Sequence, residues 1–148
     1  MKILVSACLL GLACRYDGKP SFNEDLFSLI KNHELVPVCP EQLGGLTTPR
    51  NPNEILNGKV LEKNGKDNSK PYIRGAKETL HIAKLLKCDF AILKERSPSC
   101  GSTMIYDGTF TSTKVPGNGI TAQLLKENGF IVLSEGNLDA ISALLNKK

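Results

Sequence analysis

The segment at residues 94–102, with the sequence K-E-R-S-P-S-C-G-S, combines side chains that can do chemistry. It holds an arginine, a cysteine and serines around a proline, directly after the apolar run at residues 90–93. A short apolar run that stops at Ser-Pro-Ser predicts a buried strand that ends in a loop at its carboxyl end. Ligands of open α/β sheets bind at that edge. We therefore expect this loop to carry the chemistry of the protein.

Two other segments, residues 5–18 and residues 38–50, have the same construction and also place a cysteine just past an apolar run. Cys8, Cys39 and Cys100 thus each lie a few residues beyond the carboxyl end of a predicted strand. A single cysteine is more often a small buried hydrophobe than a functional group. Three of them at one edge of a sheet, each near Pro or Gly, indicate a site instead.

The remaining cysteines and the histidines are placed less favourably. Cys88 precedes its predicted strand, so we expect it at the opposite edge of the sheet, whereas Cys14 lies on the correct side as a neighbour of the site. His33 and His81 fall in or beside predicted helices, which does not support a Cys/His zinc site. Iron–sulfur clusters are held by thiolates, normally four, and three ligands would leave one iron open. From the residues alone, a three-cysteine metal site and a cysteine nucleophile both remain open.

Two polar residues accompany these cysteines. Glu41 follows Cys39 by two residues and can aim its carboxylate at the same cavity as a general acid or base, or it is only a charge in a first helical turn. Ser97 either belongs to the site or only forms the turn around Pro98. The sequence has only four arginines, and Arg15, Arg50 and Arg96 all lie in the cysteine-bearing segments.

The length, cysteine count and net charge of the chain limit the class of protein. The chain has 148 residues and no apolar run near the ~20 residues that cross a bilayer, and its start is not a secretory signal, so we expect a cytoplasmic protein without a membrane partner. Five cysteines, an odd number, argue for reduced thiols and not for a disulfide scaffold. The net charge of +4 with scattered lysines argues against a dedicated nucleic-acid binder.

Strand and helix patterns alternate along the chain and predict an α/β fold. We expect one domain, residues 1–148, with a doubly wound, Rossmann-like or flavodoxin-like, mostly parallel sheet of about four strands. The expected strands are residues 2–5, 35–38, 90–93 and 130–133, and the expected helices are residues 24–32, 74–87, 119–127 and 138–148. A small antiparallel hairpin at residues 104–111 turns at Asp107-Gly108, and residues 51–72 form a polar excursion with a second hairpin.

Three motifs carry a resemblance to a known family. They are V-S-A-C-L-L-G with C-R-Y-D-G at residues 5–18, P-V-C-P-E-Q-L-G-G-L with T-P-R at residues 37–50, and K-E-R-S-P-S-C-G at residues 94–101. Together, and in this order, they closely resemble the thiouracil desulfidase family, long catalogued as a bacterial domain of unknown function. The resemblance extends over essentially the whole chain.

The resemblance implies an enzyme with a [4Fe-4S] cluster held by three cysteines, which match Cys8, Cys39 and Cys100, and with one open iron. Such an enzyme replaces C=S by C=O in a thiolated pyrimidine without redox change and releases sulfide. By the same matching, Glu41 and Ser97 correspond to the catalytic pair. A cluster of this kind is expected to be sensitive to oxygen, so aerobic preparations can lack it.

The resemblance leaves the substrate open between free 2-thiouracil and thiolated uridine nucleotides. We expect a phosphate-bearing substrate if Arg15, Arg50 or Arg96 faces the cavity. Otherwise these arginines neutralise the cluster or pair with Asp17 and Glu41.

Two other functions remain as alternatives. One is a hydrolase whose nucleophile, Cys100, is activated by a helix N-terminus after Gly101. The other is a metal- or nucleotide-binding module without turnover.

Overall fold

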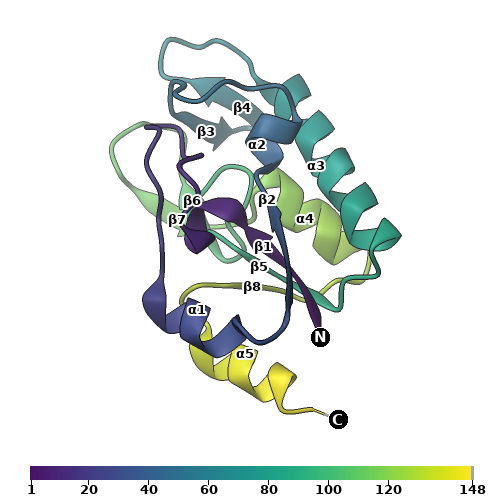
Figure 1. The fold of residues 1–148 in the computed structure, drawn as a ribbon. Coiled ribbons are helices and arrows are strands. Elements are labelled where there is room, and N and C mark those ends of the chain that lie inside the picture. The colour runs from purple at the N-terminus through teal and green to yellow at the C-terminus, as the bar shows by residue number, and fades with distance from the viewer. Residues whose placement is uncertain (148) are drawn as a thin grey trace.

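A four-stranded parallel sheet forms the centre of the fold in the computed structural model, which describes residues 1–147 (Figure 1). Its strands stand in the order β2 (Glu34–Val38), β1 (Lys2–Ser6), β5 (Phe90–Leu93) and β8 (Val132–Ser134). The chain therefore adds β2 on one side of β1 and later adds β5 and β8 on the other side. The carboxyl ends of β1 and β5 meet at this reversal, where α/β sheets leave a crevice for ligands.

Helices cover both faces of the sheet (Figure 1). Along β1, Ile3 and Val5 belong to the core cluster that holds residues of the helices α1 (Glu24–Ile30) and α5 (Leu138–Leu145). Leu4, between them in sequence, belongs to the other cluster, with residues of α3 (Ser69–Leu85) and α4 (Ile120–Glu127). This alternation follows from the period of two in a strand, and near-continuous apolar strands are typical of sheets buried on both faces.

The expected α/β class with a doubly wound parallel sheet is confirmed. The expected helix at residues 74–87 begins earlier, at Ser69, and ends at Leu85. Asp67 Oδ1 accepts a hydrogen bond from the Ser69 backbone N–H, and Pro71 lies in the first turn, where its missing N–H costs nothing. The final helix ends at Leu145, and Lys148 lies outside the described residues.

Two antiparallel hairpins lie outside the main sheet. The first, β3 (Asn53–Leu56) with β4 (Lys59–Glu62), is the hairpin expected within residues 51–72. The second pairs β6 (Met104–Tyr106) with β7 (Lys114–Pro116), so the predicted tight turn at Asp107-Gly108 is wrong. Residues 107–113 form a longer loop there, because the backbone N–H groups of Gly108 and Phe110 donate to Glu54 and not to a neighbouring strand.

The loops after β1 and β2 contain short helical turns. A 3₁₀ helix at Ala7–Leu10 follows β1, and a short helix, α2 (Pro40–Leu43), follows β2. Within residues 1–147, the structure has no helix that is both long enough and apolar enough to span a membrane.

Glycines allow α2 and α3 to touch backbone to backbone. A Cβ atom at Gly44 would lie 2.0 Å from the Pro71 carbonyl oxygen, and one at Gly75 would lie 1.9 Å from the Pro40 carbonyl oxygen. Real Cβ atoms are never this close to backbone atoms, so any larger residue would push the two helices apart. Because Glu41 lies on α2, this contact fixes one wall of the site described below.

We predict that Gly75→Ala lowers the free energy of unfolding by about 2 kcal/mol. Alanine favours a helix interior over glycine by ~1 kcal/mol, but the overpacking of two backbones, which costs about 1–3 kcal/mol or more, outweighs this gain. Denaturant unfolding measures the difference. Gly136→Ala is the matched control, because its Cβ would meet only Ser134 Oγ at 3.6 Å. Equal unfolding free energies for the two variants would contradict the prediction.

Candidate functional site

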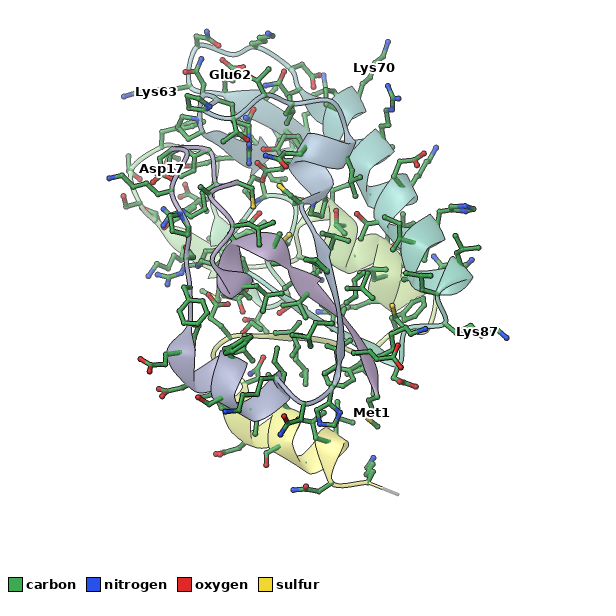
Figure 2. All side chains as sticks on the ribbon, viewed as in Figure 1. Met1, Asp17, Glu62, Lys63, Lys70 and Lys87 are labelled. Carbon is green, nitrogen blue, oxygen red and sulfur yellow. The ribbon has the colours of Figure 1, made fainter. Side chains whose placement is uncertain are left out.

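A cavity of about 560 Å³ opens at the carboxyl edge of the sheet. Its walls come from the segments that follow β1, β2 and β5, together with both hairpins and α3. Figure 2 shows sulfur atoms gathered in this part of the molecule, between β1 and α2. All eight residues that the sequence nominates line the cavity, and one further cysteine joins them: Cys8, Cys14, Arg15, Cys39, Glu41, Arg50, Arg96, Ser97 and Cys100.

The three expected cysteines come from three neighbouring strands. Cys8 lies in the 3₁₀ helix after β1, Cys39 is the N-cap of α2 directly after β2, and Cys100 lies in the loop after β5. Cys8 and Cys100 are buried and Cys39 is half-buried. Strand pairing brings them together, because Ser6 is in register with Val38 and β1 also pairs with β5.

Cys14 is a fourth thiol of the same cavity. It is buried, with 6% of its surface exposed, and its thiol lies beside those of Cys8 and Cys39. Its backbone carbonyl accepts hydrogen bonds from Cys39 Sγ at 3.7 Å and from Arg50 Nη2 at 3.0 Å. Cys88 is in contrast remote, since it precedes β5 and its neighbour Asp89 donates its backbone N–H to Lys2 at the start of β1.

Three of the cavity thiols, those of Cys14, Cys39 and Cys100, have raised pKa values in the protein alone. Burial raises the pKa of Cys100 to about 12. The thiol of Cys14 is the main cause that raises the pKa of Cys39, and burial adds to it. At Cys14, the hydrogen bond with Cys39 lowers the pKa, but the contact with Cys8 and burial outweigh it. A nucleophilic cysteine needs the opposite shift, whereas a bound metal deprotonates its thiol ligands outright.

The arrangement of the donors distinguishes between kinds of metal site. Within residues 1–147, no group of three or more His, Cys, Asp or Glu side chains is placed to hold a single metal ion. A single ion needs its ligands within one coordination sphere, with bonds of about 2.3 Å to sulfur. Cysteines spread around a cavity fit a cluster of several irons, which takes thiolates as ligands.

Glu41 and Ser97 face each other across the cavity wall. Ser97 Oγ donates to Glu41 Oε1 over a long distance of 3.5 Å, and it accepts from the backbone N–H of Cys100 at 3.0 Å. The other carboxylate oxygen, Oε2, accepts a hydrogen bond from Arg50 Nε at 2.6 Å and forms an ion pair with Arg50 Nη2 at 2.5 Å. Glu41 therefore keeps one oxygen fixed by Arg50 and turns the other toward Ser97.

The three candidate arginines occupy different environments. Arg50 has an 8% exposed side chain that is fully engaged by Glu41, Cys14 and the segment at residues 47–48. Arg15 pairs with Asp17 at 3.2 Å and donates to Ser21 Oγ. Arg96 is exposed, and its guanidinium makes no hydrogen bond or ion pair with any part of the chain that the structure describes. Of the three, Arg96 presents its charge to the cavity most freely.

Glu95, which the sequence reasoning missed, braces the loop that carries Ser97 and Cys100. Its carboxylate accepts hydrogen bonds from the backbone N–H groups of Ser102, Thr103 and Met104 and from Thr103 Oγ1. Burial alone would raise the pKa of Glu95, but these hydrogen bonds lower it to about 2. The position of this glutamate, between a predicted strand and a Ser-Pro-Ser turn, was the signal in the sequence that could have indicated its role.

Aromatic residues were missed as well. All three tyrosines of the chain line the cavity, and Phe110 joins them: Tyr16, Tyr72 and Tyr106. Tyr72, on α3, is 2% exposed, and burial together with the negative charge of Glu41 raises its pKa. Tyr106 and Phe110 come from the second hairpin and its loop. Local sequence could not place them, since hairpin and helix reach the cavity only through tertiary contacts.

Comparisons with known proteins identify the family of this chain. The family model described as 2-thiouracil desulfurase matches residues 3–137. The solved structure of a protein named [4Fe-4S]-dependent thiouracil desulfidase TudS is similar with a TM-score of 0.91 and 40% identity, covering 97% of each chain. The uncharacterized protein YbbK of Bacillus subtilis (strain 168) is 44% identical over 149 residues, which cover 94% of this chain and 99% of YbbK. This chain belongs to the 2-thiouracil desulfurase family.

Proposed function

We propose that this protein, as one domain, is a [4Fe-4S]-dependent enzyme that desulfurises thiolated pyrimidines. The observation that carries the proposal is the meeting of Cys8, Cys39 and Cys100 with Glu41 and Ser97 in one cavity. The family and the name of the similar solved structure support the same reaction. The overall change is C=S plus water to C=O plus hydrogen sulfide, in which the sulfur leaves without a change of oxidation state.

Cys8, Cys39 and Cys100 would hold the cluster, and one iron would have no protein ligand. Five free cysteines fit a reducing cytoplasm, which we propose as the location. When bound, the cluster supplies a Lewis-acidic iron that polarises the thiocarbonyl and accepts the sulfide.

The polar residues of the cavity would handle water and protons. Glu41 takes a proton from the attacking water, and Ser97 orients that water or the ring by hydrogen bonding. Arg50 holds Glu41 Oε2, so that Oε1 stays directed toward Ser97. A fixed and largely buried base needs little rearrangement when the water attacks.

We propose free 2-thiouracil and a thiolated uridine monophosphate as the candidate substrates. Its volume of about 560 Å³ lies within the range of small-molecule sites. Arg96 is the group best placed for a phosphate, because Arg50 is bound to Glu41 and Arg15 to Asp17.

A hydrolase with Cys100 as its nucleophile fits the structure less well. Burial raises the pKa of Cys100, and none of the described residues that line the cavity is a histidine that could act as its base. A binding module without turnover is also less well supported, because it does not account for the pairing of Glu41 with Ser97.

We predict that Cys8→Ala, Cys39→Ala and Cys100→Ala each abolish cluster assembly. Anaerobic reconstitution of the unsubstituted protein is expected to give about four irons per chain, and each variant close to none. Iron and labile-sulfide counts, together with sulfide release from 2-thiouracil, are the measurements. Cys88→Ala, at the opposite edge of the sheet, is the control with full iron content.

The Cys14→Ala variant completes this series. If three ligands hold the cluster, it keeps its irons although Cys14 lines the same cavity. Retained metal-free activity in the Cys8 and Cys39 variants, with loss only at Cys100, would replace the proposal by the hydrolase.

We predict that Glu41→Gln lowers kcat by about 10²–10⁴-fold at unchanged iron content, because a positioned general base contributes that much. The amide still fills the space beside Arg50 but takes up no proton. Single-turnover sulfide release from the loaded protein measures the effect. A variant with near-normal turnover would remove Glu41 from the chemistry.

We predict that Arg96→Ala raises KM about tenfold for a thiouridine monophosphate and little for 2-thiouracil, because only the nucleotide offers a phosphate to the guanidinium. Steady-state kinetics on both substrates gives the comparison. Arg74→Ala, an exposed arginine of α3 outside the cavity, is the control. Equal changes in KM for both substrates would exclude a phosphate contact at Arg96.

A further inference from the structure

The loop at residues 107–113, which joins β6 to β7, is held in an unfavourable conformation. Phe110 has φ of 58° and Ser112 has φ of 61°, so two residues with side chains adopt the left-handed region. This conformation is uncommon for any residue other than glycine and is a genuine outlier for a bulky one. Such conformations persist only where the surroundings enforce them, and they cluster at ligand sites.

Glu54 of the first hairpin enforces this conformation. Its Oε1 accepts hydrogen bonds from the backbone N–H groups of Gly108 at 3.0 Å and of Phe110 at 3.1 Å. Glu54 is 9% exposed and forms no ion pair with the residues that the structure describes. A buried carboxylate without a cation is costly unless hydrogen bonds satisfy it, so this carboxylate is committed to the loop.

Close packing fixes the loop from a second side. A Cβ atom at Gly108 would lie 2.9 Å from the Ile55 carbonyl oxygen and 2.8 Å from Leu56 Cβ. The loop therefore rests directly on β3, and the two hairpins form one unit beside the carboxyl edge of the sheet (Figure 1). The side chains that this unit adds to the cavity wall include two aromatic rings, those of Tyr106 and Phe110.

We propose that Phe110 is a specificity-determining residue, whose ring stacks on the planar pyrimidine of the substrate and which Glu54 positions for that contact. This inference rests on the proposed function, because it assigns a partner to the heteroaromatic ring of that same substrate. A pyrimidine offers a flat face to any aromatic side chain, and stacking holds such a ring whether or not it carries a ribose and a phosphate. Phe110 thus selects for the ring, while Arg96 acts on the nucleotide alone.

The test compares Phe110→Ala with Phe110→Tyr in the cluster-loaded protein. Stacking of a base on an aromatic residue is lost on truncation to alanine, so Phe110→Ala raises KM for 2-thiouracil and for a thiouridine monophosphate alike, by roughly tenfold. The tyrosine variant keeps KM within about twofold, because it preserves the ring, and kcat stays close to normal in both. Phe27→Ala, an exposed aromatic of α1 outside the cavity, is the control.

A double-substitution cycle tests the role of Glu54. Glu54→Ala alone raises KM as Phe110→Ala does, and the double variant is no worse than Phe110→Ala, because both act through the same ring. Thermal unfolding shows whether the Glu54→Ala protein folds. If it does not fold, Glu54→Gln is used in its place; this variant keeps an acceptor oxygen, so we expect a smaller rise in KM. Additive effects would show that Glu54 does not act through Phe110.

Calorimetric titration of 2-thiouracil separates this inference from the proposed reaction. One outcome is that the loaded protein binds 2-thiouracil but releases no sulfide, and that Phe110→Ala weakens the binding about tenfold. This outcome would support the stacking contact and contradict the proposed reaction. If sulfide is released and Phe110→Ala changes neither KM nor the dissociation constant by more than twofold, the result supports the proposed reaction and contradicts the stacking contact.

Discussion

The pairing of β1 with β2 on one side and with β5 on the other is the interaction on which the site depends. The parallel register Ser6↔Val38 places the ends of β1 and β2 side by side, so that the residues following them share one edge. Beyond the end of β5, Lys94 still donates its backbone N–H to Ser6 Oγ at 2.9 Å. Cysteines that are far apart in sequence thereby reach one cavity, although no short motif joins them. The conformation of the turns after the strands then determines which of their side chains line the cavity.

Three carboxylates hold the cavity in shape in two different ways. Glu41 is balanced by the guanidinium of Arg50, which lies almost out of contact with water. Glu95 and Glu54 form no ion pair within residues 1–147 and instead accept hydrogen bonds from backbone N–H groups of loops. A charged acceptor strengthens each of these hydrogen bonds, and several N–H groups that a loop would otherwise leave unpaired are satisfied at once. These carboxylates therefore help to order the loops of the site.

The sequence was sufficient for those features that depend on neighbouring residues. Cys8, Cys39 and Cys100 lie in the segments that follow apolar runs, so strand ends and cysteines could be placed together. The alternation of strands and helices predicts the layered sheet. Features that depend on distant partners were not predictable. Glu54 meets Phe110 across 56 positions, and this contact converts a predicted tight turn into a loop. Helix α3 begins at Ser69, whose backbone N–H donates to Asp67, in a stretch that the sequence pattern assigns to a polar excursion.

The carbonyl oxygen of Cys14 has a further consequence for how the site takes up a metal. In the protein alone it accepts hydrogen bonds from both the Cys39 thiol and Arg50. A thiolate ligand has no proton to donate, so a metal at Cys39 removes the first of these bonds. The second remains, because the carbonyl has two lone pairs and Arg50 is held in place by Glu41. The loss of the thiol proton at Cys39 would therefore leave the Cys14 carbonyl with its hydrogen bond from Arg50.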